Sequence, residues 1–105
     1  MQIQVNTDHN IHGAVELAES IREELQHNLK RFDEYLTRIE VHISDKNSDK
    51  RGGGDDIRCL IEARLEGHQP NVVSHDGANV KQALTGAEQK LTRQLDKIVE
   101  RQRNH

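Results

Sequence analysis

Residues 28–45, NLKRFDEYLTRIEVHISD, change the spacing of their apolar side chains partway along. In the first part these side chains are three or four positions apart, as on one face of a helix, and then they occupy every second position, as on one face of a strand. The helical spacing continues upstream, so we predict a helix from about Gly13 to Leu36, followed by a strand over residues 38–44. The apolar stripe of this helix comprises Ala14, Leu17, Ala18, Ile21, Leu25, Leu29, Phe32 and Leu36.

Alternation of apolar and polar residues predicts three further strands. The first is MQIQVNT at residues 1–7, the third is IRCLIEARL at residues 57–65, and a shorter fourth is NVVSH at residues 71–75. Leu60 is the one apolar side chain on the polar side of the third strand. A second long helix is predicted from Val80 to about Arg103, with an apolar stripe of Val80, Leu84, Ala87, Leu91, Leu95 and Ile98.

The predicted order is β-α-β-β-β-α, an α+β fold similar to a double-stranded-RNA-binding domain. Each strand has one apolar face and each helix one apolar stripe, so both helices should pack on one face of a four-stranded mixed sheet. A right-handed crossover makes the first two strands parallel. Short connections and the glycine-containing loop DKNSDKRGGGDD, residues 45–56, make strands two to four antiparallel. We expect residues 1–105 to form a single domain.

Several features of the sequence are typical of a cytoplasmic protein. No run of about 18 apolar residues could span a membrane, and the N-terminal MQIQVNTDHN lacks the basic and apolar regions of a signal peptide. Cys59 is the lone cysteine and cannot form an internal disulfide. Its place in an apolar strand pattern favours a buried, inert thiol over a nucleophile. We therefore expect a cytoplasmic location and no membrane contact.

The polar residues form no recognisable catalytic or metal-binding motif. His9 and His12 have an H-x-x-H spacing but lie in a predicted turn, and neither an HExxH motif nor a cysteine-rich zinc pattern is present. His42 and His75 could approach each other across the sheet, although solvated histidines are the more frequent arrangement. The glycines of KRGGGDD precede two Asp residues and a strand, unlike a phosphate-binding Walker A loop. We expect no enzyme activity, no metal and no cofactor.

Positive charge gathers on the second predicted helix, although the whole chain has a formal net charge of −3. Residues 78–105 contain six Lys or Arg and three acidic residues, a local charge of +3. At about 100° per residue, Lys90, Lys97 and Arg101 lie within roughly 20° of one another, with Arg93 about 60° to one side. Such a row can bind nucleic-acid phosphates, although cations near a helix C-terminus also suit the helix dipole and a solvated face. The opposite flank carries Asp96 and Glu100.

Two stretches carry a family resemblance within this element order. They are NLKRFDEYLTRIEVHISD at residues 28–45 and ALTGAEQKLTRQLDK at residues 83–97, in which KLTRQLDK is close to the pattern K-L-x-R-Q-L-x-K. Together they resemble the short form of the ribosome hibernation promoting factor family. This family is also called the ribosome-associated inhibitor, sigma-54 modulation or ribosomal subunit interface family.

The resemblance implies a non-enzymatic translation inhibitor that is monomeric when free. Such a protein binds the small ribosomal subunit in the channel used by mRNA and tRNA during stationary phase or stress, through basic side chains on 16S rRNA phosphates. The family pattern includes Lys90, Arg93 and Lys97. Lys30 and Arg31 lie at the similarly basic end of the first helix, and Arg101 extends the row by helical geometry. In sequence order, the implied rRNA-binding residues are Lys30, Arg31, Lys90, Arg93, Lys97 and Arg101.

The sequence also departs from the family. Members commonly have a D-x-Y-x-A-I pattern near the start of the last helix, where this chain reads NVKQAL, with Asn79 and Lys81 at the two polar positions. The first predicted helix is also acidic. A second hypothesis is therefore a protein-interaction module on the same fold, with the acidic helix face or the open sheet binding a protein partner instead of rRNA.

Overall fold

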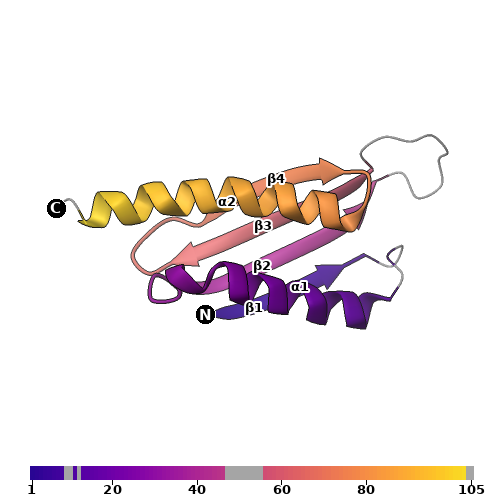
Figure 1. Cartoon of the computed structure of the whole chain (residues 1–105), viewed down its shortest axis with the longest axis horizontal. Helices are drawn as coiled ribbons and strands as arrows, with labels where there is room; N and C mark the ends of the chain where they lie inside the picture. The colour runs from indigo at the N-terminus through magenta and orange to yellow at the C-terminus, as the bar shows by residue number, and fades with distance from the viewer. Residues whose placement is uncertain (9–10, 12, 47–55, 104–105) are drawn as a thin grey trace.

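The computed structural model describes residues 1–8, 11, 13–46 and 56–103 and has the β-α-β-β-β-α order (Figure 1). The α+β fold class predicted from the spacing of apolar residues is confirmed. A short 3-10 helix, η1, adds one element between the first helix and the second strand. The elements are β1 (Gln2–Thr7), α1 (Ala14–Asn28), η1 (Lys30–Phe32), β2 (Leu36–Asp45), β3 (Ile57–Leu65), β4 (Asn71–Gly77) and α2 (Val80–Arg103).

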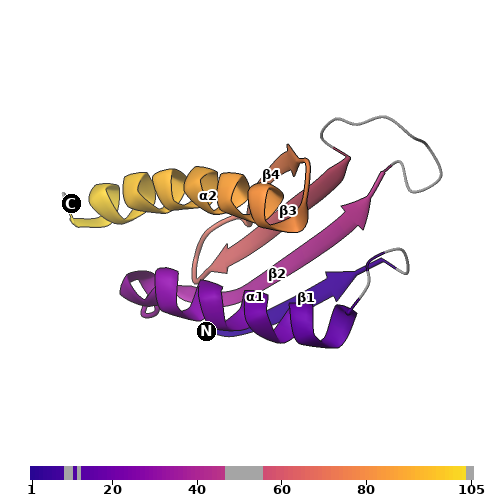
Figure 2. The same ribbon diagram turned by 45° about the vertical axis from the view of Figure 1, so that its right-hand side comes forward.

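The strands form one mixed sheet in the order β1-β2-β3-β4. β1 pairs with β2 in parallel, whereas β2 with β3 and β3 with β4 are antiparallel, as predicted. One row across the sheet consists of apolar residues and passes through Val5, Val41, Ile61 and Val73. Both helices cover one face of the sheet (Figures 1 and 2), and the core lies between them and this face.

Each helix buries its apolar stripe against a different part of the sheet. α1 packs on β1, whereas α2 lies over β3 and β4. Cys59 of β3 is in the same core, so the prediction of a buried thiol is confirmed. Burial, followed by the charge of Glu88, raises the pKa of this thiol to about 12. The buried helix residues are Ile21 and Leu25 of α1 and Ala83, Leu84, Ala87, Leu91 and Leu95 of α2.

α1 ends at Asn28, so the prediction of a helix that continues to Leu36 is wrong. Leu29 leaves the helical region with φ −105° and ψ 13°, and η1 turns the chain toward β2. Phe32 and Leu36 are nevertheless buried, so the spacing of three and four reflected burial in a turn and a strand rather than a continuous helix. An unbroken helix would carry the chain about 12 Å further, whereas β2 must begin beside the start of β1 to pair with it in parallel.

Two strand ends extend two residues beyond the predicted ones. β2 begins at Leu36 instead of residue 38, and β4 continues to Gly77 instead of residue 75. A Cβ atom on Gly77 would lie 2.6 Å from the backbone nitrogen of Ala83, so glycine allows β4 to turn directly into α2. This close approach places the first turn of α2 against the end of β4.

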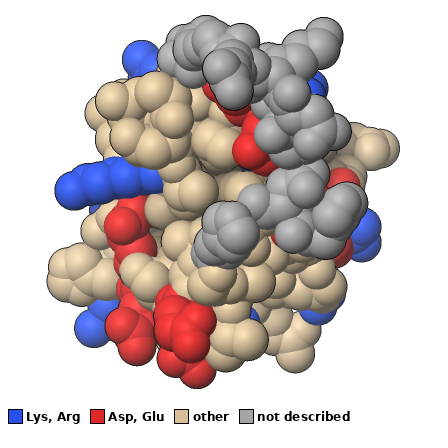
Figure 3. All heavy atoms as spheres, turned by 90° about the vertical axis from the view of Figure 1, so that its right-hand side faces the viewer, with Lys and Arg blue, Asp and Glu red and all other residues tan. Residues whose placement is uncertain are grey.

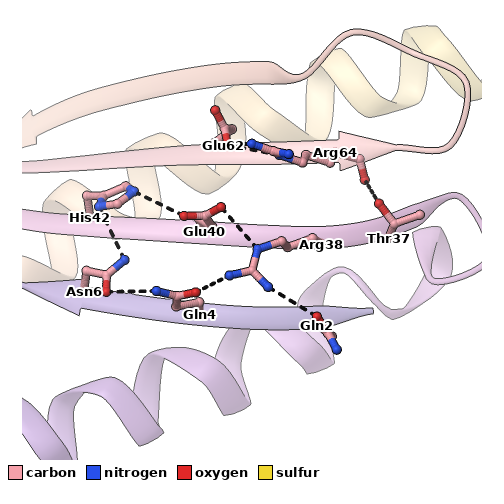
Figure 4. Close-up of polar contacts among 9 residues, drawn as sticks. All are labelled: Gln2, Gln4, Asn6, Thr37, Arg38, Glu40, His42, Glu62 and Arg64. Carbon is pink, nitrogen blue, oxygen red and sulfur yellow. Dashed lines mark hydrogen bonds and ion pairs between the residues drawn. The ribbon is translucent and has the colours of Figure 1, made fainter.

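The sheet face away from the helices is polar, and its side chains bind one another (Figure 4). Arg38 of β2 lies between the strands: its guanidinium donates hydrogen bonds to Gln2 and Gln4 of β1 and pairs with Glu40 at 3.2 Å. Leu60, the apolar residue expected on the polar side of β3, is partly exposed on this face. Most charges drawn in Figure 4 therefore already have partners within the sheet.

The β2–β3 connection is described only at its two ends. The backbone N–H of Lys46 donates to the carbonyl oxygen of Asp56 at 2.8 Å and so extends the hairpin beyond the strands. The predicted glycine-containing loop lies largely outside the described residues. Among the described helices, none is long and apolar enough to cross a membrane.

Candidate nucleic-acid interface

The first turn of α2 is held by its own polar side chains. The Asn79 side-chain oxygen accepts a hydrogen bond from the backbone N–H of Gln82 at 2.9 Å, as an N-cap residue does. The Gln82 side chain in turn accepts from the backbone N–H of Ala78 at 3.1 Å. Asn79 thus supplies the capping oxygen at the position where the family pattern has Asp, so the start of α2 is stabilised despite this departure.

Four of the six sequence-predicted residues lie on the outer flank of α2. Lys90, Arg93, Lys97 and Arg101 are all exposed, because the buried stripe of the helix turns toward β3 and β4. Within the described part of the chain, Arg93, Lys97 and Arg101 have no hydrogen-bond or ion-pair partner. Their charges face solvent and are open to an external anion. We call these four residues the basic row.

Lys90 contacts the edge of the sheet. Its Nζ donates a hydrogen bond to the carbonyl oxygen of Ser74 at 2.8 Å. β4 is an edge strand, and this contact occupies one of its outward carbonyl groups. Since an ammonium group has three N–H donors, two remain for another acceptor. The ammonium charge is therefore anchored without being neutralised.

The flank of α2 that faces α1 is acidic. Glu88 accepts hydrogen bonds from the side-chain amide of Asn28 at 3.2 and 3.4 Å. Burial, followed by the hydrogen bond and charge of Glu24, raises the pKa of Glu88 to about 7. The acidic side chain of Glu88 thus contacts α1, and it also lines a groove with Arg93 of the basic row.

Arg31 is separated from the basic row. Its Nη1 lies 2.6 Å from Asp96 Oδ1 on α2, and its guanidinium carbon lies 4.1 Å from the centre of the Phe32 ring. The hydrogen bond raises the pKa of Arg31 and lowers that of Asp96. Lys30, also on η1, is exposed. The six sequence-predicted residues therefore form two groups, with Lys30 and Arg31 on η1.

Two residues beside the basic row were not predicted from the sequence. Lys81 and His75 line the same groove as Lys90 and Arg93. On a helical wheel Lys81 lies about 180° from Lys90, so the angle alone does not group them. His75 comes from β4, and only the packing of this strand against α2 brings it to the groove. The sequence feature that could have identified Lys81 is the NVKQAL stretch, where this lysine departs from the family pattern.

The metal and cofactor interpretations gain no support from the described residues. His42 lies on the open sheet face, whereas the ring of His75 would contact a Cβ atom on Gly86 of α2, so these two histidines lie on opposite faces. The approach across the sheet that the sequence left open does not occur, because the pairing places His42 in line with Ser74 rather than with His75. His9 and His12 lie outside the described residues. In the described ranges, no group of three or more His, Cys, Asp or Glu residues could hold a metal ion.

A separate acidic surface lies over α1. Figure 3 looks onto the end of the molecule where both helices begin, and acidic side chains gather there on the side of α1. Exposed carboxylates of this helix include Glu16, Glu19 and Glu23. Acidic and basic side chains are therefore segregated between α1 and the outer flank of α2, which explains how a chain with net charge −3 can present a cationic surface.

Comparisons with known proteins agree with this architecture. The family model described as sigma 54 modulation protein / S30EA ribosomal protein matches residues 9–103. The N-terminal domain of Protein Y from Thermus thermophilus is similar, with a TM-score of 0.69 at 19% identity over 93% of this chain and 99% of that one. A ribosomal subunit interface protein from Coxiella burnetii has a TM-score of 0.71 at 15% identity over 95% and 99%. No curated protein sequence matches significantly. The two structural similarities show the fold, and the match over residues 9–103 confirms the family resemblance.

Proposed function

The chain belongs to the sigma 54 modulation protein / S30EA ribosomal protein family, and from this premise we propose that it is a ribosome-binding inhibitor of translation. It binds the small ribosomal subunit through the basic row of α2. The partner groups are 16S rRNA phosphates, and the bound protein occupies the channel used by mRNA and tRNA in stationary phase or stress. This role places it in the cytoplasm with the ribosomes.

The observation that carries this proposal is the set of unpaired cations on α2. Arg93, Lys97 and Arg101 are exposed without a partner among the described residues, whereas the acidic residues Glu88 and Asp96 of the same helix bind groups on the α1 side. A rigid helix with cations along one flank suits the phosphate backbone of RNA, where affinity comes from charge neutralisation and counterion release. Phosphate contacts position a protein on RNA without requiring a particular base sequence.

Inhibition by such a protein needs no chemical step. The bound domain sterically excludes mRNA and tRNA from the channel, and the basic row supplies the affinity that holds the domain there. We therefore propose a non-enzymatic action without metal or cofactor. The free protein acts as a monomer.

The alternative is a protein-interaction module that uses the open sheet face or the acidic face of α1. On the open face, Arg38 and Arg64 pair with Glu40 and Glu62 within their own strands. These pairs reduce the charge available to a partner, which favours the basic row as the interface. The two hypotheses also differ in their expected salt dependence, since only phosphate binding releases several condensed counterions.

Affinity for purified small ribosomal subunits at several salt concentrations tests the proposal. The wild-type protein should bind with an affinity that falls steeply with salt, and Lys90→Glu/Lys97→Glu should bind much more weakly. Arg22→Glu/Arg103→Glu is a control with the same change in net charge outside the basic row, and it should bind nearly as well as the wild type. Binding that is indifferent to salt and to the Lys90/Lys97 changes would contradict the proposal and support a protein partner.

A further inference from the structure

A groove of about 470 Å³ follows the outer flank of α2 where the helix passes β4. None of the described residues that line it is acidic. The basic members come from the first and middle turns of α2 and from β4, and a hydroxyl and two side-chain amides also line the groove. The residues used below are His75, Lys81, Thr85, Gln89, Lys90 and Arg93.

Gly86 lets the His75 ring lie directly against the helix. A Cβ atom at position 86 would be 2.0 Å from Cδ2 and 2.3 Å from Cγ of the ring, distances that no real contact allows. The imidazole therefore occupies the space that a side chain at position 86 would fill. It lies under the groove in a position set by the packing of β4 on α2.

Lys90 is held at the side of this groove before any ligand arrives. Its hydrogen bond to the Ser74 carbonyl at 2.8 Å fixes the ammonium group and leaves two N–H donors. A fixed cation loses less side-chain entropy on binding an anion than a free one does. Lys81 and Arg93 reach the same groove from other turns and have no partner within the described residues.

Three of the four acidic residues of α2 and β4 are bound to other groups, and the fourth, Glu100, does not line the groove. On α2, Glu88 accepts from Asn28, and Asp96 pairs with Arg31. On β4, Asp76 is paired on the open sheet face with Arg58 at 2.9 Å and Lys46 at 2.8 Å. None of these carboxylates lines the groove, although Glu88 lines an adjoining one together with Arg93.

We propose that this groove binds one phosphate group, and that Lys81 is a phosphate contact in addition to the basic row. Lys81, Lys90 and Arg93 supply the charge, while the Thr85 hydroxyl and the Gln89 amide supply neutral donors for the remaining oxygens. The inference rests on the proposed function in assigning the phosphate to an RNA backbone. A free nucleotide offers the same chemistry, so the test separates the two sources.

Nuclear magnetic resonance titration of the full chain with inorganic phosphate, adenosine monophosphate and a six-nucleotide single-stranded RNA tests the groove directly. We expect saturable shifts of the Thr85, Gly86 and Gln89 amide signals with all three probes, and the tightest binding with the RNA. Tighter binding of adenosine monophosphate would overturn the assignment to RNA. Shifts that do not saturate, or that are as large around Arg101 as around Gly86, would overturn the groove itself.

Two variants separate the groove from a general effect of charge on α2. Lys81→Gln should weaken binding of the RNA about fivefold or more at low salt and lower the slope of log affinity against log salt concentration by about 1. Arg103→Gln removes the same charge from the same helix outside both the groove and the basic row, and it should leave the response to inorganic phosphate unchanged. Equal responses of the two variants to inorganic phosphate would contradict the inference. Both side chains are exposed, and the dispersion of the amide signals checks that each variant is folded.

Failure of the inference is distinguishable from failure of the proposed function. Wild-type protein that binds small subunits but gives no localised phosphate response contradicts only the groove. Wild-type protein that gives the phosphate response but does not bind small subunits contradicts the ribosomal partner instead.

Discussion

Arg31 Nη1 and Asp96 Oδ1 lie 2.6 Å apart, in an ion pair between residues that are 65 positions apart in the chain. The pair joins the turn after α1 to the α1-facing side of α2. Its geometry decides that Arg31 neutralises an acidic residue of α2 instead of extending the basic row.

Asp96→Asn should strengthen binding to small ribosomal subunits. The substitution removes a negative charge from the helix that carries the basic row and releases Arg31, so both the affinity at low salt and the salt slope should increase. The pair is about half exposed, with side-chain exposures of 57% and 49%, so its loss should cost less than about 1 kcal/mol of stability. Salt titration and urea unfolding measure the two effects, and weaker binding by a folded variant would contradict the expectation.

Glu88 makes the stability of the protein depend on pH. Its pKa is about 7 in the folded protein against an ordinary value of 4.5, mainly because of burial. The folded state therefore keeps a proton that the unfolded chain releases. This contribution is fully present below about pH 4.5 and is lost as the pH rises through about 7.

Glu88→Gln should remove this dependence, because the amide stays neutral at every pH. In urea unfolding, the variant should gain stability relative to the wild type from about pH 5 to 7 and keep a constant difference above that range. Glu23→Gln, an exposed change on α1, is the control and should give a difference that varies little with pH. A constant difference for Glu88→Gln across the whole range would show that the carboxyl titrates normally.

Gly86→Ala should destabilise the protein although alanine is the better helix former. In an open helix position the change would gain about 0.5–1 kcal/mol, but here the new Cβ would meet the His75 ring at 2.0 Å. Displacing the ring should cost about 1–3 kcal/mol. In a His75→Ala background the clash is gone, so the same Gly86→Ala change should become stabilising. A double-mutant cycle measures this reversal, and equal effects in both backgrounds would exclude the contact.

Cys59 should be unreactive in the folded protein. Burial raises the pKa of its thiol to about 12, so almost no thiolate is present at pH 8 and the sulfur is shielded from solvent. Alkylation by iodoacetamide should therefore be slow in buffer and fast in urea above the unfolding transition. Comparable rates in the two conditions would show that the thiol is accessible.

Much of the architecture could be predicted because short-range spacing reports which side chains face the core. Ile39, Val41 and Ile43 identify β2 by alternation alone, and the stripe from Leu84 to Leu95 identifies α2. The exposed position of Lys97 and Arg101 follows from the same periodicity. The end of α1 could not be predicted, because a buried turn and a strand start continued the helical spacing through Phe32 and Leu36.

The sequence by itself determined the order of the elements, the face that each one buries and the presence of cations along α2, because all three depend on residues a few positions apart. Only the tertiary structure decided which charges remain free. Arg31 meets Asp96, Glu88 is half buried near Asn28, and His75 enters a groove beside Lys81 through contacts between separate elements. Local periodicity says which way a side chain points on its own element, but the distance to a distant partner depends on how the elements pack.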